Sequence, residues 1–204
     1  MGDLSPGGRA APVAAAKAAA RKRAMALRDA VPAARRTAMA EAVARLDLPF
    51  LAGREVVSAY YPMGSEFDVL PLMSRIAGLG HATALPAVAG RGRPLRFHAW
   101  VPGEPTVRGV RDIPVPAPGA AERVPDLLLV PFLQFDRQGF RLGYGAGFYD
   151  LTLAALRAAR DILAVGIGFS AQEVARVPRA GHDQRLDLIV TEREIIACRP
   201  EAGA

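Results

Sequence analysis

Residues 127–130 read Leu-Leu-Leu-Val and lie between Pro125 and Pro131. A short, continuous apolar run between turn residues is typical of a β-strand that is buried on both faces of a sheet. Residues 162–168 have the same character, and residues 148–160, which lie between the two runs, have the pattern of a helix. Buried strands that alternate with helices favour an α/β layered fold with a mainly parallel sheet.

The rest of the chain extends this pattern in both directions. We expect further helices over residues 12–30, 32–46 and 68–79, and further strands over residues 56–61, 82–85, 95–100, 186–190 and 194–198. Residues 103–125 contain five prolines, which predicts a long connection with at most short strands. We therefore predict a three-layer α/β/α fold in one domain, residues 12–204, preceded by a flexible terminus, residues 1–11.

Composition excludes several classes of protein. The chain has 204 residues, of which 51% are hydrophobic, so one domain with a sizeable core is expected and general disorder is not. No window contains about 18 consecutive apolar residues, and Lys17 and Arg21–Arg23 interrupt any secretory leader, which argues against a membrane span or export. The single cysteine, Cys198, cannot form an intrachain disulfide. We expect a soluble, cytoplasmic monomer.

All of the net positive charge lies near the N-terminus. Eight of the 26 basic residues fall within residues 1–36, against two acidic residues, and the remainder of the chain is balanced. Lys17, Arg21 and Arg28 are spaced so that they share one face of the predicted helix. The plain interpretation is a solvated helix face. The functional interpretations are contact with nucleic acid, an acidic membrane surface or a polyphosphate.

A glycine-rich segment follows the strand predicted at residues 127–130. It reads Phe135-Asp-Arg-Gln-Gly-Phe-Arg-Leu-Gly-Tyr-Gly-Ala-Gly-Phe-Tyr-Asp150 and leads into a predicted helix. Alternate glycines let the backbone approach a ligand closely, and a helix N-terminus favours phosphate. Arg141 could meet phosphate or carboxylate oxygens through its two-pronged guanidinium group. The spacing matches neither a Walker A loop nor a dinucleotide fingerprint, so an anion-binding loop and a merely structural glycine turn both stay open.

The same segment resembles the signature of the 5-formyltetrahydrofolate cyclo-ligase family, also called 5,10-methenyltetrahydrofolate synthetases. The similarity covers residues 17–196, and further motifs occur in the order that the family shows. They are Lys17…Arg21, Tyr61-Pro62…Glu66-Phe67-Asp68, Leu85-Pro86, Phe97…Trp100 and Gly166…Phe169…Gln172…Val177-Pro178…Asp183…Thr191. One departure is that Gly109–Pro114 lacks a glutamate that the family often has there.

The resemblance implies an enzyme that uses ATP, with Mg²⁺ as cofactor, to convert 5-formyltetrahydrofolate to 5,10-methenyltetrahydrofolate. An N-formyl group is a poor electrophile, and its oxygen is a poor leaving group. Phosphorylation of that oxygen would allow the N10 amine to attack the carbon and phosphate to depart. Positioning and charge neutralisation carry most of such chemistry, so no nucleophilic side chain is required. The implied partners are small molecules, without nucleic acid or membrane.

The resemblance also implies roles for particular residues. Arg141 would be catalytic and neutralise the transferring phosphoryl group, although an ion pair with Asp136 or Asp150 is the plain alternative. Asp150 and Asp183 would hold magnesium, with Asp187 as a competitor of Asp183. ATP would be bound by Lys17, Arg21, Arg141, Leu142, Gly143, Tyr144, Gly145, Ala146, Gly147, Phe148 and Tyr149. The folate would contact Met63, Glu66, Asp68, Tyr144, Gly145, Ala146, Gly147 and Phe148.

Other interpretations stay open for some of these residues and for the whole chain. Asp68 could instead cap a helix, and Trp100 could stack on a ring or belong to the core. An α/β sugar-phosphate isomerase or acyl-CoA-type enzyme could use a glycine loop, but it would leave the ordered motifs unexplained. A nucleic-acid-binding module could use the basic first 36 residues, but no aromatic residue precedes Phe50.

Overall fold

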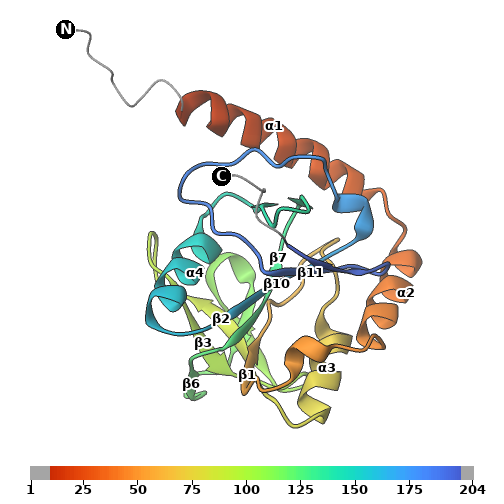
Figure 1. The fold of residues 1–204 in the computed structure, drawn as a ribbon. Helices are drawn as coiled ribbons and strands as arrows, with labels where there is room; N and C mark the ends of the chain where they lie inside the picture. The colour runs from red at the N-terminus through yellow and green to blue at the C-terminus, as the bar shows by residue number, and fades with distance from the viewer. Residues whose placement is uncertain (1–9, 199–204) are drawn as a thin grey trace, which may run out of the picture.

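In the computed structural model, which describes residues 10–198, the chain folds around an eight-stranded sheet (Figure 1). Its strands are β1 (Val56–Ser58), β2 (Ala82–Val88), β3 (Leu95–Ala99), β6 (Glu122–Arg123), β7 (Leu127–Pro131), β10 (Leu163–Ile167), β11 (Leu188–Val190) and β12 (Ile195–Ala197). They are ordered β12-β11-β10-β7-β1-β2-β3-β6. β11, β10, β7, β1 and β2 run parallel, and the strands outside them are antiparallel. The predicted mainly parallel sheet is confirmed.

β7 lies at the centre of the sheet and is buried on both faces, as its apolar run predicts. Side chains alternate across a strand, so Leu127 and Leu129 join one core cluster while Leu128 and Val130 join the other. β7 pairs with β1 on one side and with β10 on the other, with Leu127 opposite Val57 and Leu163. A strand covered on both faces needs no alternation of apolar and polar residues.

Helices cover the two faces of the sheet and give the predicted three layers. The helices are α1 (Ala10–Asp29), α2 (Ala33–Ala44), α3 (Leu70–Gly78) and α4 (Phe148–Ala159), with short 3-10 turns η1 (Pro49–Leu51), η2 (Val110–Asp112) and η3 (Ser170–Gln172). α2 and α3 bury Val43, Leu72 and Ile76 on one face. α4 buries Leu153 on the other face. No helix of residues 10–198 combines the length and hydropathy needed to cross a bilayer.

α1 belongs to neither covering layer, because it crosses the edge of the sheet over the loops (Figure 1). It buries Ala20 against Leu142 of the glycine segment and against Val177. The helix begins at Ala10, two residues before the predicted start, and Pro12 fits its first turn, where a missing N–H costs little. The flexibility expected for residues 1–9 falls outside the described residues.

Two small hairpins lie outside the eight-stranded sheet. The proline-rich connection forms β4 (Thr106–Arg108) and β5 (Pro114–Pro116), which agrees with the short strands expected there. The glycine-rich segment contains β8 (Gln134–Phe135) and β9 (Arg141–Leu142), which were not predicted. Strands of two residues leave no periodic pattern in a sequence, so this hairpin is visible only once the chain is folded.

Candidate active site

The order of the parallel strands defines where a ligand can bind. From β1 the chain passes to β2 on one side and then returns to β7 on the other side, so the loops that follow β1 and β7 diverge. In open α/β sheets, ligands bind in the crevice at the carboxyl ends of the strands where the order reverses. Residues 59–69 follow β1 and residues 132–147 follow β7, and both meet under α1.

α1 contacts each of three loops at this edge through a different basic side chain. Lys17 Nζ lies 2.7 Å and 2.5 Å from the two carboxylate oxygens of Asp183, which follows β10. Arg21 Nε donates to the carbonyl of Gly143 at 2.8 Å. Arg28 Nε donates to Ser65 Oγ at 2.9 Å. The basic stripe seen in the sequence therefore faces the protein body and not bulk solvent.

The base of the glycine segment is fixed by a buried carboxylate. Asp136 is 1% exposed, and it accepts hydrogen bonds from the backbone amides of Gln138, Phe140 and Val177 at 2.9–3.1 Å. Its oxygens are therefore used inside the turn, and it is not the ion-pair partner of Arg141. Gly139 in the same turn has φ +89°, and a Cβ there would lie 2.5 Å from the Leu186 carbonyl oxygen, so only glycine fits.

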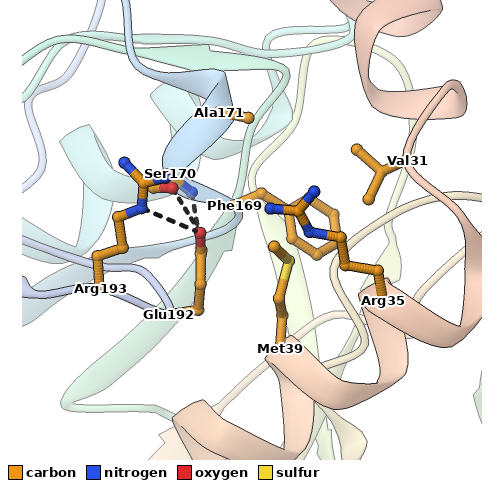
Figure 2. Close-up of a pocket in the computed structure, with 8 residues that line it drawn as sticks. All are labelled: Val31, Arg35, Met39, Phe169, Ser170, Ala171, Glu192 and Arg193. Atoms are coloured by element: carbon orange, nitrogen blue, oxygen red, sulfur yellow. Dashed lines mark hydrogen bonds and ion pairs between the residues drawn. The ribbon is translucent and has the colours of Figure 1, made fainter.

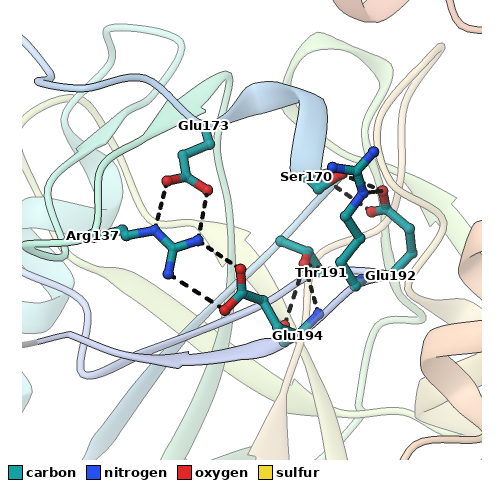
Figure 3. Close-up of polar contacts among 7 residues, drawn as sticks. Arg137, Ser170, Glu173, Thr191, Glu192 and Glu194 are labelled. Atoms are coloured by element: carbon teal, nitrogen blue, oxygen red, sulfur yellow. Dashed lines mark hydrogen bonds and ion pairs between the residues drawn. The ribbon is translucent and has the colours of Figure 1, made fainter.

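A network of surface ion pairs braces the same hairpin. Arg137 lies in the turn between β8 and β9 and pairs with Glu173 beside η3 and with Glu194 before β12, at 2.7 Å and 2.6 Å (Figure 3). The two carboxylates raise the pKa of the guanidinium group through hydrogen bonds and charge, so it stays charged. Exposed pairs contribute little to stability individually, but this one links three segments that converge at the base of the loop.

Beyond the hairpin the loop turns into α4 through two left-handed glycines. Gly145 has φ +100° and Gly147, the N-cap of α4, has φ +72°. A Cβ at Gly145 would lie 3.1 Å from Cζ of Arg21, so the loop also packs closely beneath α1. Residues 144–147 are exposed, and the N–H groups at a helix start favour anions. These features combine a tight turn with an accessible site for an anion.

Arg141 forms a buried ion pair with one of the two expected partners. Its side chain is 4% exposed, and Nη2 lies 2.9 Å from Oδ1 of Asp150 in the first turn of α4. Nη1 donates to the backbone carbonyl of Gln184 at 2.5 Å, and the backbone N–H of Gln184 donates to Asp150 Oδ1 at 3.0 Å. The fork of Arg141 therefore joins α4 to the segment that carries Asp183.

The two aspartates expected to hold magnesium lie in the first turn of α4 and in the loop between η3 and β11. Asp150 Oδ2 has no hydrogen-bond partner among residues 10–198, whereas both oxygens of Asp183 contact Lys17 and one also accepts from the Ala180 amide. One or two carboxylates with phosphates and waters are the usual ligands of Mg²⁺. Asp150 fits this role as it stands. Asp183 fits it once Lys17 changes partner.

Asp187 is no competitor of Asp183 in this geometry. It accepts from the Ala164 amide at 2.7 Å and from Arg157 at 2.9 Å. Ala164 and Asp187 lie at the beginnings of β10 and β11, and therefore at the edge opposite the loops. The described residues contain no group of three or more acidic, histidine or cysteine side chains suited to a metal.

Residues expected on the folate side gather around Glu66 and Tyr144. Glu66 accepts from the Met63 amide at 2.8 Å, and its charge acts on the nearby phenol of Tyr144. Burial and the charge of Glu66 together raise the pKa values of Tyr60, Tyr144 and Tyr149, so these phenols stay protonated. A carboxylate from the β1 loop and a phenol from the glycine segment thus meet at the reversal point of the sheet.

Three other residues singled out in the sequence have contacts within the fold. Asp68 accepts from the Leu70 amide at 3.0 Å just before α3, but the N-cap of that helix is Val69, so the alternative that Asp68 is the N-cap is wrong. Trp100 is 3% exposed, donates to the Glu104 carbonyl and contacts Tyr61 edge-on, so it belongs to the core. The Leu142 side chain is buried in a core cluster, so its backbone alone is available to a nucleotide.

Arg28 is a site residue that sequence analysis did not assign. It is 6% exposed, and besides Ser65 it donates to the Tyr144 hydroxyl. The spacing that puts it on the face of Lys17 and Arg21 was the available signal. A separate shallow cavity of about 140 Å³ lies between the start of α2 and η3, with Arg35 and Glu192 among its lining (Figure 2). It includes none of the residues expected to bind ligand.

The doubly wound sheet, the glycine loop at its reversal point and the basic helix across both define an α/β enzyme with its site at the carboxyl edge. The family model of the 5-formyltetrahydrofolate cyclo-ligase family matches residues 13–192. The chain therefore belongs to that family and is a ligase, as its motifs indicated.

Individual relatives agree with this assignment. The chain is 34% identical over 180 residues to the 5-formyltetrahydrofolate cyclo-ligase of Mycolicibacterium smegmatis, covering 84% of this chain and 92% of the relative. It is 29% identical over 147 residues to the Escherichia coli protein of the same name, covering 68% and 79%. The solved structure of Aquifex aeolicus 5,10-methenyltetrahydrofolate synthetase is similar with a TM-score of 0.75 and 28% identity, covering 92% and 95%.

Proposed function

We propose that the protein catalyses the ATP-dependent cyclisation of 5-formyltetrahydrofolate to 5,10-methenyltetrahydrofolate, with release of ADP and phosphate. Family membership and the names of the relatives support this activity. The observation in this chain that carries it is the three-point docking of α1, which joins the loops after β1, β7 and β10 through Arg28, Arg21 and Lys17. A reaction between a nucleotide and a second ligand needs such loops to act together.

The nucleotide side of the site consists of Lys17, Arg21, Arg141 and residues 142–149. The left-handed glycines and the start of α4 supply N–H groups for phosphate oxygens. Arg21 is already anchored on the Gly143 carbonyl, so its charge is held beside the loop. Arg141 supplies a buried positive charge next to Asp150, which suits the neutralisation of a transferring phosphoryl group.

Asp150 and Asp183 would hold magnesium, which supplies charge neutralisation on the phosphates when it is bound. In this role Asp183 gives up its contact with Lys17. The freed ammonium group of Lys17 is then available to a phosphate oxygen. Without ligand, the charges of Lys17 and Asp183 neutralise each other. With ligand bound, Lys17 would neutralise phosphate and Asp183 would neutralise magnesium.

The folate side consists of Met63, Glu66, Asp68 and residues 144–148. The Glu66 carboxylate can accept two hydrogen bonds from the aminopyrimidinone edge of the pterin, which would direct the N5-formyl group towards the nucleotide. The formyl oxygen attacks the γ-phosphorus, and ADP departs. N10 then attacks the formyl carbon and loses its proton, the C–O bond breaks, and phosphate leaves.

Two alternatives lose support from the geometry. A nucleic-acid module would need the basic stripe of α1 to be free, but Lys17, Arg21 and Arg28 are directed into the protein. A sugar-phosphate isomerase or acyl-CoA-type enzyme offers no reason for the Arg141–Asp150 pair to adjoin Asp183. We further propose that the protein acts as a cytoplasmic monomer.

The direct test mixes the purified protein with 5-formyltetrahydrofolate, ATP and magnesium and follows the near-ultraviolet absorbance of the methenyl product. We expect product only when all three components are present, with one ADP released per product. Omission of ATP and omission of magnesium are the controls. Absence of product from a folded protein that binds ATP would refute the proposed reaction.

A further inference from the structure

Arg28 is a buried cation without an anionic partner of its own. The buried charged residues among residues 10–198 are Arg28, Asp136 and Arg141. Asp136 is satisfied by backbone amides, and Arg141 pairs with Asp150. Arg28 forms no ion pair within the described chain. Burying a charge costs free energy unless hydrogen bonds or an opposite charge compensate for the lost water. The groups that contact Arg28 therefore indicate its function.

Those neighbours are neutral groups on two different loops. Arg28 donates from Nε to Ser65 Oγ on the loop after β1 and from Nη1 to the Tyr144 hydroxyl on the glycine segment. Its guanidinium carbon lies 5.6 Å from the centre of the Tyr144 ring. Ser65 in turn donates to Asp29. One side chain therefore holds the two loops that diverge at the reversal point of the sheet.

Tyr144 extends this contact to Glu66. Arg28 Nη1 donates to the Tyr144 hydroxyl, and the Glu66 carboxylate lies near enough to this phenol to raise its pKa. Burial and the charge of Glu66 raise the pKa of Tyr144, so the phenol stays protonated. Glu66 accepts from the Met63 amide at 2.8 Å and is the neighbour of Ser65, which Arg28 holds.

We propose that Arg28 is a positioning residue for the folate, holding the Tyr144 hydroxyl in place beside the loop that carries Glu66, where the pterin edge would bind. Lys17 and Arg21, on the same face of α1, serve the nucleotide instead. Different residues of α1 therefore serve different substrates, with Lys17 and Arg21 at the nucleotide and Arg28 at the folate. This inference rests on the proposed function, because it assigns Arg28 to one of the two substrates of that reaction.

The experiment measures kcat and the two KM values of Arg28→Met, with Arg23→Met as the matched control. Arg23 lies on the same helix, but it is exposed. Loss of charge-assisted hydrogen bonds predicts that Arg28→Met raises KM for 5-formyltetrahydrofolate by about 10- to 100-fold, while KM for ATP changes by less than about threefold. Arg23→Met should match the wild type. Equal changes in both KM values, or a change in KM for ATP alone, would overturn the proposal.

A double-mutant cycle with Tyr144→Phe tests whether Arg28 acts through Tyr144. If it does, the double variant has a folate KM no higher than the worse single variant, since the second change removes an interaction that is already lost. Effects that multiply would overturn the proposed route. Arg28→Lys keeps the charge but cannot span both hydroxyls, so it should recover only part of the folate affinity.

The same cycle covers the case in which Arg28→Met does not fold. Tyr144→Phe removes only the hydroxyl and keeps the backbone N–H groups proposed for the nucleotide. Alone it should therefore raise the folate KM and leave the ATP KM near its wild-type value, and the reverse pattern would contradict the proposal. Turnover by the wild-type protein separates the two levels of inference. An inactive wild type refutes the proposed reaction, whereas an active wild type with an unselective Arg28 variant refutes only the role of Arg28.

Discussion

Lys17 and Asp183 neutralise each other across 166 positions of sequence, with Nζ 2.7 Å and 2.5 Å from the two carboxylate oxygens. Their side chains are 14% and 10% exposed, so the pair is largely shielded from water. The residue proposed to bind phosphate thus occupies both oxygens of a residue proposed to bind the metal. Binding of a magnesium–nucleotide complex must therefore reorganise this pair.

Asp183→Asn tests that relationship, because it keeps the shape of the side chain and removes its charge. We expect the magnesium concentration for half-maximal rate to rise by about tenfold or more. The free energy of unfolding without ligand should fall by about 1–3 kcal/mol, since a shielded ion pair is broken. Asp161→Asn is the control, because Asp161 is 89% exposed and pairs with Arg54 away from the loops. An unchanged magnesium dependence would place the metal elsewhere.

Arg141→Lys should impair turnover without unfolding the protein. A lysine can keep one contact, but it cannot meet Asp150 and the Gln184 carbonyl together as the guanidinium does. We expect kcat to fall by about 10- to 1000-fold, the range for loss of one strong transition-state contact. Arg157→Lys, at the other end of α4, should retain activity. Near-normal turnover of Arg141→Lys would reduce Arg141 to a structural role.

Gly139→Ala should destabilise the fold through the base of the glycine segment. The left-handed backbone costs about 1–2 kcal/mol for any residue with a Cβ. At Gly139 the new atom also meets the Leu186 carbonyl at 2.5 Å. Gly53→Ala carries the backbone cost alone, because Gly53 has φ +75° and open space around it. Denaturant unfolding should show the larger loss for Gly139→Ala. Equal losses would mean that the hairpin relaxes freely.

Cys198 should make stability fall at alkaline pH. Burial raises the pKa of its thiol from 9.0 to about 12. The folded state therefore favours the protonated thiol, and this contribution is fully present below pH 9 and is lost as pH rises towards 12. Unfolding curves of the wild type and Cys198→Ala, measured from pH 7 to pH 10.5, should diverge above pH 9, with the wild type losing more. If the free energy of unfolding of the two proteins changed equally with pH, burial of the Cys198 thiol would not affect its pKa, and the prediction would be wrong.

Sequence analysis predicted the sheet well because its central strands are buried on both faces. The run at residues 127–130 has no polar position, and only a strand between two helical layers can bury every side chain in turn. The resemblance to the family was also specific, because its motifs extend in order over most of the chain. The roles of individual ligand-binding residues stay predictions that the experiments above address.

What the sequence could not supply was the partner of each charge. Helical spacing showed that Lys17, Arg21 and Arg28 share a face, but not that each would contact a different loop. Asp136 and Asp187 look equivalent to Asp150 in sequence. Folding buries the first among backbone amides and carries the second to the opposite edge of the sheet. These distinctions depend on contacts between distant segments, which local patterns do not encode.

The placement of α1 across the loops has a consequence for synthesis of the chain. Ribosomes make α1 before any of its partners. Ser65 follows its contact on α1 by 37 positions, but Tyr144, Gly143 and Asp183 follow theirs by 116 to 166 positions. Contacts between such distant segments form late, because closing a long loop costs entropy before it is rewarded. We expect the first helix to be translated to be among the last elements to dock. Nucleotide binding would then begin only when nearly the whole chain has emerged, and a ribosome-bound chain that ends before residue 183 should bind no ATP.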